Sequence, residues 1–168
     1  MIIRPEQRTD HDAVRRINTA AFESPAEANL VDALRTNASP LISLVAEDDA
    51  GEIVGHILFS PATLIEHPGC LIMGLAPMAV TPARQRQGIG SALVRAGLKQ
   101  CEQLGALAII VLGHPAYYPR FGFAPASRLN IVSDYDVPDD VFLAMELKHG
   151  AMSGKSGRIK YHEAFGAL

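Results

Sequence analysis

The apolar residues of this chain follow two periodicities, which predict helices and strands in a definite order. Helical spacing follows two capping-box signals, Thr9 with Asp12 and Ser24 with Glu27, so two consecutive short helices are expected early in the chain. A longer helix is predicted over residues 88–104, where apolar side chains line one face and Gly105 provides the stop. Short apolar runs predict strands at residues 2–4, 41–47, 53–64, 71–80, 106–112 and 141–147.

The order of these elements predicts a mixed, mostly antiparallel sheet flanked by helices, in the α/β (α+β) class. The second and third strands are separated only by a short polar turn, so they should form an antiparallel hairpin. The strand at 71–80, the long helix and the strand at 106–112 predict a right-handed crossover and a parallel pair. We therefore assign residues 1–168 to a single domain, with its core in 2–148. The remaining residues, 149–168, form a C-terminal extension that we expect to be partly flexible because it is rich in glycine and serine.

A proline interrupts the strand predicted at residues 71–80. Pro77 cannot donate a hydrogen bond to a neighbouring strand, so it does not fit a regular central strand. It indicates either a β-bulge or an edge strand that tolerates proline. A bulge would release backbone groups from the ladder and leave them able to bind another molecule.

Composition and charge narrow the functional classes. The net charge is −3 and no basic stripe with interleaved aromatic residues is present, so no nucleic-acid partner is expected. No run approaches about 18 apolar residues, and residues 1–6 lack the pattern of a signal peptide, so we expect a cytoplasmic protein without a membrane partner. Cys70 and Cys101 lie far apart and outside any metal-binding spacing, so we expect reduced thiols and no metal.

The stretch at residues 78–94 has the order of a phosphate-binding site: a strand, a turn with two glycines and a helix N-terminus. A Walker loop would need Gly-Lys-Ser or Gly-Lys-Thr, whereas Gly90 is followed by Ser91 and Ala92. A Rossmann fingerprint would need a third glycine and the first strand of a βαβ unit, and both are missing. An alternative without a ligand remains, in which the glycines only ease a tight turn.

Two motifs in this chain resemble the GNAT (Gcn5-related N-acetyltransferase) superfamily. Residues 85–90, Gln-Arg-Gln-Gly-Ile-Gly, match its Q/R-x-x-G-x-G/A signature, and residues 117–123, Tyr-Tyr-Pro-Arg-Phe-Gly-Phe, resemble its later aromatic segment. Together with His114-Pro115-Ala116 and Met145-Glu146-Leu147, they look like the YhbS-like branch. The resemblance spans roughly residues 2–148 and implies a sheet that splays between its fourth and fifth strands.

The resemblance also implies acetyl-CoA as co-substrate, with no metal. Its pyrophosphate would be held by backbone amides at the helix N-terminus, and the pantetheine arm by backbone groups of the proline-interrupted strand. Arg86 stands where many relatives have glycine, and its side chain would point either outward or toward the adenosine 3′-phosphate. The cofactor-binding positions carried over are Met78, Ala79, Val80, Gln85, Arg86, Gln87, Gly88, Ile89, Gly90, Ser91 and Tyr117.

The implied reaction is acetyl transfer to a primary amine by direct attack in a ternary complex. Tyr118 aligns with the family's general acid, and proton donation from a tyrosine to a thiolate is feasible. The alternatives are that Tyr118 only packs against the coenzyme, or that Tyr117 is the acid. The general base stays open among His114, Glu27, His56 and a chain of water molecules, and Glu27 is equally a candidate for acceptor binding.

The acceptor is the least determined part of this interpretation. An amine-bearing small molecule or peptide is expected, in a pocket built from the early helices, the hairpin loop and the C-terminal segment. Two other functions remain: a non-catalytic acyl-CoA-binding sensor with the same fold, and a transferase of a longer acyl group. Dimers are common in the superfamily, so a homodimer is an arrangement that the resemblance allows.

Overall fold

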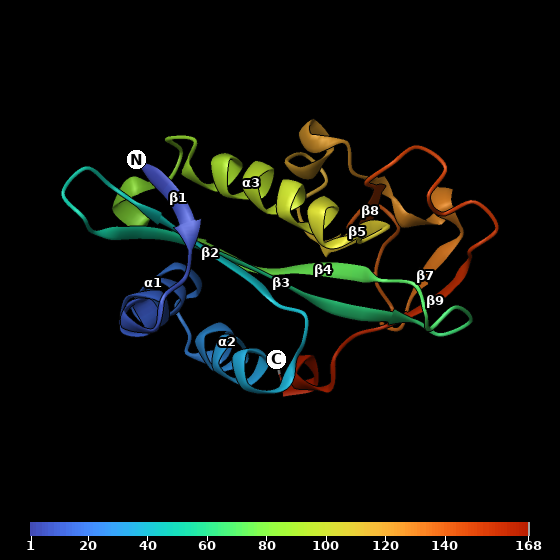
Figure 1. The fold of residues 1–168 in the computed structure, drawn as a ribbon, viewed down its shortest axis with the longest axis horizontal. Coiled ribbons are helices and arrows are strands. Elements are labelled where there is room, and N and C mark those ends of the chain that lie inside the picture. The colour runs from blue at the N-terminus through green and yellow to red at the C-terminus, as the bar shows by residue number, and fades with distance from the viewer. Residues whose placement is uncertain (168) are drawn as a thin grey trace.

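The structure is a computed structural model that describes residues 1–167, with strands and helices in an order close to the expected one (Figure 1). The α-helices are α1 (His11–Phe22), α2 (Ala26–Asn37) and α3 (Ile89–Leu104). The strands are β1 (Ile2–Pro5), β2 (Ile42–Glu47), β3 (Ile53–Leu64), β4 (Ile72–Val80), β5 (Ala108–Leu112), β6 (Ala124–Pro125), β7 (Ile131–Ser133), β8 (Phe142–Glu146) and β9 (Gly157–Lys160). Short 3-10 helices are η1 (Arg8–Asp10), η2 (Pro82–Arg84), η3 (Tyr118–Phe121), η4 (Ala126–Leu129) and η5 (Glu163–Ala167).

The sheet is mixed and mostly antiparallel, which confirms the predicted fold class. Its main path runs β1-β2-β3-β4-β5-β8-β6, and within this path only β4 and β5 are parallel. The α3 crossover between these two strands lies on one face of the sheet, while α1 and α2 cover the other face (Figure 1). No helix in the described part of the chain is long and apolar enough to cross a membrane.

The proline in β4 lies at a bulge in a central strand, so the edge-strand alternative is wrong. Ile57 of β3 pairs with Met78, but Phe59 pairs with Leu75, which leaves Ala76 and Pro77 opposite a single β3 residue. On its other side, β4 pairs with β5 only through residues 72–74. The two parallel strands therefore separate after Gly74, and this is the expected splay.

The starts of α1 and α2 differ from the predicted capping boxes. A Thr9 box was expected, but it is the Asp10 carboxylate that accepts a hydrogen bond, 2.7 Å long, from the Gln7 backbone N–H. At α2, Ser24 Oγ accepts a hydrogen bond from the Ala26 backbone N–H. Glu27 does not return to the backbone as a capping box requires, and its side chain is left for another role.

The core between α3 and the sheet depends on close approach at one glycine. The buried residues of α3 are Ile89, Leu93, Val94, Gly97 and Cys101. A Cβ at position 97 would collide with the ring of Phe59, which is itself fully buried. Gly97 is therefore required by helix-to-sheet packing, a role distinct from that of the glycines that begin α3.

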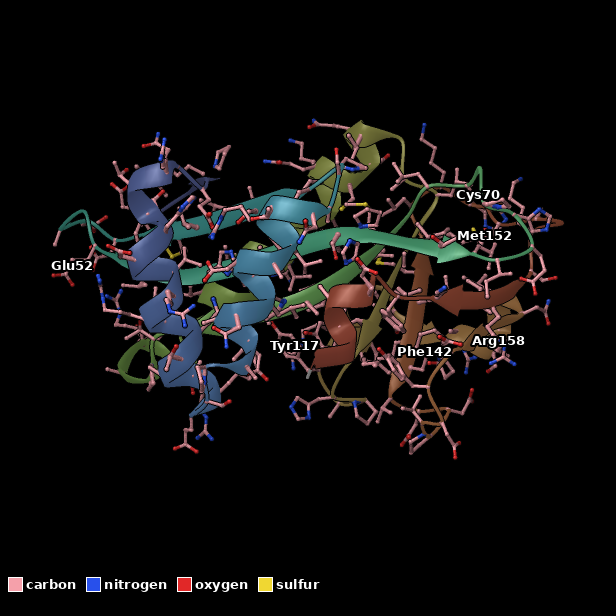
Figure 2. The ribbon with its side chains drawn as sticks, turned by 90° about the horizontal axis from the view of Figure 1, so that it is seen from below. Glu52, Cys70, Tyr117, Phe142, Met152 and Arg158 are labelled. Atoms are coloured by element: carbon pink, nitrogen blue, oxygen red, sulfur yellow. The ribbon has the colours of Figure 1, made fainter. Side chains whose placement is uncertain are left out.

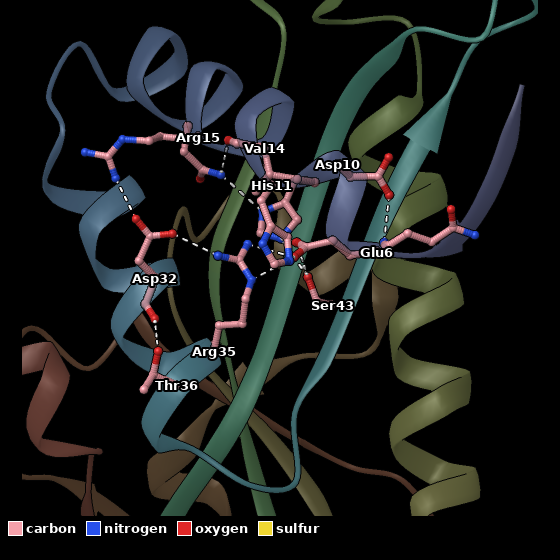
Figure 3. Close-up of polar contacts among 12 residues, drawn as sticks. Glu6, Asp10, His11, Val14, Arg15, Asp32, Arg35, Thr36 and Ser43 are labelled. Atoms are coloured by element: carbon pink, nitrogen blue, oxygen red, sulfur yellow. Dashed lines mark hydrogen bonds and ion pairs between the residues drawn. The ribbon is translucent and has the colours of Figure 1, made fainter.

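A buried polar network joins α1, α2 and the sheet around Glu6 (Figure 3). Its carboxylate accepts hydrogen bonds from Arg35 Nε and Ser43 Oγ, both 2.8 Å long, and lies 3.3 Å from His56 Nε2 and 3.2 Å from His11 Nε2. Burial alone would raise the pKa of Glu6, but the hydrogen bonds and positive charges around it prevail and lower the pKa to about 2. Burial lowers the pKa of His56, which favours its neutral form.

The C-terminal segment adds a strand, β9, and a helical turn, η5, to the elements that the sequence analysis predicts. β9 pairs antiparallel with β3 at Thr63 and Leu64, and parallel with β7, a three-residue strand that was not predicted. η5 then packs against α2, and Figure 2, seen from below, shows α1, α2 and η5 side by side in front of the sheet. The segment thus reaches the same face of the sheet as the two early helices.

Candidate active site

A groove of about 620 Å³ lies between the end of β4 and the N-terminus of α3. We call it the helix groove. Its lining contains most of the positions proposed for coenzyme binding. The lining residues are Ala21, Phe22, Met78, Ala79, Val80, Arg84, Gln85, Arg86, Gly88, Ile89, Gly90, Ser91, Tyr117 and Arg120.

The loop that begins α3 is shaped by two residues in the left-handed region. Gly88, the N-cap of α3, has φ +86°, and Arg86 has φ +62°. Glycine adopts a positive φ without the steric cost that a Cβ brings, so the backbone at position 86 favours glycine, the residue expected at this place in many relatives. No side chain caps α3, so the N–H groups of its first turn remain able to bind a ligand.

Three arginines give the helix groove its charge. Arg84, Arg86 and Arg120 line it, and no described lining residue is acidic. Arg84 is anchored to the β2–β3 hairpin, because its Nη1 lies 3.1 Å from Asp48 Oδ2. Arg120 stacks its guanidinium 4.4 Å from the centre of the Tyr117 ring. The groove therefore suits a ligand with several negative charges.

The open edge of β4 presents backbone groups toward the splay. The Thr81 N–H donates to the Val54 carbonyl of β3, with a distance of 2.9 Å. Because hydrogen bonds alternate along an antiparallel strand, Ala79 also faces β3, while Met78 and Val80 direct their N–H and C=O groups to the other side. The carbonyl of Val80 accepts a hydrogen bond from Gln85 Nε2 at 3.1 Å, in agreement with this orientation.

A second cavity, of about 560 Å³, lies where β4 and β5 separate. We call it the splay cavity. It shares Phe22, Met78 and Tyr117 with the helix groove, so the two spaces adjoin. Its other lining residues are Glu27, Leu30, Gly74, Leu75, Ala76, Pro77, Ile110, Val111, Leu112, Gly113, His114, Tyr118, Tyr135, Tyr161, Phe165 and Gly166.

Tyr118 lies at the boundary between this cavity and the core. Its side chain is largely buried, and its ring packs edge-on against Tyr117 with 5.0 Å between centroids. A Cβ at Gly113 would collide with the ring, so that glycine makes room for it. Burial, with a smaller contribution from Tyr117, raises the pKa of Tyr118 to about 12. Its hydroxyl is therefore protonated throughout the neutral range.

The three candidate bases lie in different environments. His114 is exposed and lines the splay cavity, as does Glu27, whose buried Oε2 has no hydrogen-bond partner among the described residues. His56 is fully buried in the network around Glu6 and lines neither of the two spaces, so it is not placed to act as the base. No group of three or more metal-ligating side chains occurs in the part of the chain that the structure describes.

Several lining residues were not among the predicted site residues. Arg84 and Arg120 could have been found from the sequence, because Arg84 directly precedes the first motif and Arg120 lies within the second. Phe22 fits the apolar spacing of the first helix, but its side chain is 40% exposed and lines both spaces. Tyr161 and Phe165 reach the splay cavity only through the pairing of β9 with β3, which local sequence does not specify.

Comparison with known proteins agrees with this geometry. A sequence model described as an acetyltransferase (GNAT) domain matches residues 40–125. The N-acetyltransferase YhbS of Escherichia coli K12 is 34% identical over 165 residues, covering 98% of both chains. The crystal structure of Escherichia coli YhbS in complex with CoA matches with a TM-score of 0.92 and 34% identity, covering 98% of this chain and 91% of that one. The crystal structure of a Brucella melitensis GNAT family acetyltransferase in complex with acetyl-CoA matches with a TM-score of 0.78 and 35% identity. This match covers 98% of this chain and 97% of that one. The chain therefore belongs to the GNAT family of acetyltransferases.

Proposed function

We propose that the protein transfers an acetyl group from acetyl-CoA to a primary amine by direct attack within a ternary complex. The observation that carries this proposal is the union of two spaces: an arginine-lined groove at an uncapped helix N-terminus and a cavity at the splay beside Tyr118. Relatives with 34% and 35% identity have been solved with CoA and acetyl-CoA, which supports the same ligand here.

The coenzyme would lie with its phosphates in the helix groove. Backbone N–H groups of residues 85–90 and Ser91 would bind the pyrophosphate, since the N-terminus of a helix favours negative charge. Arg84 and Arg120 would add charge-assisted hydrogen bonds. The pantetheine arm would continue along β4, where Met78 and Val80 offer N–H and C=O groups like an unpaired strand edge.

In the reaction, the neutral amine would attack the thioester carbonyl carbon. A C–N bond forms, the C–S bond breaks, the amine loses a proton and the leaving thiolate gains one. A backbone N–H of β4 would stabilise the oxyanion that develops during attack. Tyr118 would donate the proton to the thiolate, and its raised pKa keeps that proton available at neutral pH. Glu27, His114 or a water chain would take the proton from the amine.

The proposal is tested by a Tyr118→Phe variant, with Glu52→Gln as a control, because Glu52 is exposed on the hairpin and lines neither the helix groove nor the splay cavity. Calorimetric titration should show that both variants bind acetyl-CoA as the unmodified protein does. Thiol release with an accepted amine should fall at least about tenfold for Tyr118→Phe alone, because general acid catalysis typically contributes a factor of that size or more.

Two outcomes would overturn the proposal. If acetyl-CoA does not bind, the assignment of the ligand is wrong. If acetyl-CoA binds but no amine releases CoA, the protein is an acyl-CoA sensor rather than a transferase. Competition among acyl-CoA chain lengths separates acetyl transfer from transfer of a longer acyl group, since the longer chain would then displace acetyl-CoA.

A further inference from the structure

One side of the splay cavity lies away from the proposed path of the coenzyme along the helix groove and β4. This side is built from α2, the loop before β8 and the segment after β9, so it lies across the sheet from α3. In Figure 2, the labelled Tyr117 lies between α2 and η5, where the helix groove and the splay cavity meet. A second substrate that enters from this side would meet the thioester end of the coenzyme.

One carboxylate is available on this side. Glu27 is the only acidic residue among the described residues that line the cavity, and its Oε2 is buried without a hydrogen-bond partner. A buried carboxylate oxygen without a partner is costly unless a ligand supplies a donor. An ammonium group provides both the hydrogen bond and the opposite charge.

A second buried polar atom lies on the same side. The hydroxyl of Tyr161 has no hydrogen-bond partner among the described residues. Burial, and the proximity of Tyr135, raise the pKa of Tyr161, so the hydroxyl stays protonated and can donate. A ligand with an oxygen atom away from its ammonium group would satisfy it.

The rest of this side is aromatic and apolar. Tyr161 is stacked on Tyr135 with 5.2 Å between ring centroids, and its ring is 5.7 Å from that of Phe165. Three large apolar side chains at the edge of the cavity are exposed: Phe22 (40%), Leu112 (42%) and Tyr135 (42%). Such a wall suits a flat apolar body better than a flexible polycation or an extended peptide.

We propose that the acceptor is a small monoamine with a flat apolar body, whose ammonium group pairs with Glu27 and whose distal oxygen accepts a hydrogen bond from Tyr161. This inference rests on the proposed acetyl transfer and names the class of its second substrate. Phe165 and Tyr135 cover the apolar body, so the C-terminal segment determines which amines are accepted.

The test measures CoA release from acetyl-CoA with four amines as probes: tyramine, phenethylamine, spermidine and a peptide with an N-terminal alanine. The expected order of kcat/KM places tyramine first, phenethylamine second, and spermidine and the peptide at least about tenfold lower. Tyramine and phenethylamine differ only by the phenolic oxygen, so their ratio reports on the contact with Tyr161.

Two variants with matched controls assign the contacts. Tyr161→Phe should remove most of the preference for tyramine, about fivefold, whereas Tyr135→Phe, the same change in the same stack, should keep it. Glu27→Gln should raise the KM of both aromatic amines about tenfold or more while leaving the affinity for acetyl-CoA unchanged; Glu23→Gln, at an exposed position, should change neither. Urea unfolding curves check that each variant is folded.

The outcomes separate this inference from the proposed function. If spermidine or the peptide is the better acceptor, or if Tyr161→Phe behaves like Tyr135→Phe, acetyl transfer stands and the assigned acceptor class is wrong. An unchanged KM in Glu27→Gln likewise overturns the ammonium contact. If acetyl-CoA binds and none of a wide range of amines is acetylated, the proposed function fails and this inference fails with it.

Discussion

The phenol oxygen of Tyr117 lies 3.0 Å from the hydroxyl of Ser91, a hydrogen bond that joins the loop after β5 to the first turn of α3. This contact holds together the two motifs that identify the family, and it lies at the junction of the helix groove and the splay cavity. Arg120 reinforces it by stacking on the Tyr117 ring and donating a hydrogen bond of 2.9 Å to the Tyr117 carbonyl.

Loss of this contact should weaken coenzyme binding. Tyr117→Phe is expected to lower the affinity for CoA by about two- to tenfold, since one net hydrogen bond contributes about 0.5–1.5 kcal/mol. Calorimetric titration of Tyr117→Phe, Ser91→Ala and the double variant measures the coupling. If the two single effects simply add, the hydrogen bond does not contribute to binding.

Replacing Gly90 by alanine should leave the stability of the fold unchanged or raise it, but should weaken the binding of CoA. A Cβ there would lie 3.5 Å from Met78 Cε and from the Tyr117 hydroxyl, which are ordinary contacts, and alanine favours a helix by up to about 1 kcal/mol. Gly90→Ala should therefore be as stable as the unmodified protein or more so. In the proposed binding mode the methyl group would occupy the space of the pyrophosphate, so the affinity for CoA should fall at least about tenfold.

The matched control for Gly90→Ala is Gly97→Ala in the same helix. It places a methyl group against the ring of Phe59, so unfolding in urea should show a loss of about 1–3 kcal/mol. Folded Gly97→Ala protein should still bind CoA. Normal CoA affinity in Gly90→Ala would show that phosphate does not approach this glycine.

Arg86 stores conformational strain that glycine would relieve. At φ +62°, a residue with a Cβ costs about 1 kcal/mol more than glycine. Arg86→Gly should therefore be about 1 kcal/mol more stable than Arg86→Ala, which loses the same charge but keeps the strain, as measured by urea unfolding. Equal stabilities would mean that the loop relaxes out of the left-handed conformation.

Acid should destabilise the fold through the network around Glu6. Both Glu6 and His56 have lower pKa values in the folded protein than in the unfolded chain, so each contributes stability at higher pH that is lost as pH falls. For His56 the loss begins near pH 6.5, and for Glu6 it runs from about pH 4.5 to about 2. Arg35 and His11 are the other charged or titratable groups that face the carboxylate.

Unfolding free energies measured across this pH range test the network. Glu6→Gln should be less stable at neutral pH but should lose less stability between pH 4.5 and 2.5, whereas Glu52→Gln, an exposed change on the hairpin, should follow the unmodified protein. The same slope in both variants would show that another group governs acid unfolding.

Sequence predicted the parts of this protein that depend on local pattern. The start of α3 at Gly88 and its stop at Gly105 follow from the conformational freedom of glycine, so they were readable in advance. Pro77 showed only that its strand is irregular, and the choice between a bulge and an edge strand needed the structure. Glu27 fitted a capping box by spacing, yet the structure directs it into the splay cavity, because tertiary surroundings outweigh a motif of this strength. β7 and β9 are short strands that lie far apart in the sequence, and no turn motif or hydrophobic pattern near either strand predicts that they pair.

The pairing of β9 with the C-terminal end of β3 has a consequence for how acceptor choice can be altered. Glu27, Tyr161 and Phe165 all lie outside residues 40–125, which the family sequence model matches, whereas most of the helix groove lies inside them. Chimaeras that exchange α2 and the segment from Gly157 between relatives should therefore transfer the amine preference of the donor protein and leave the affinity for the coenzyme unchanged.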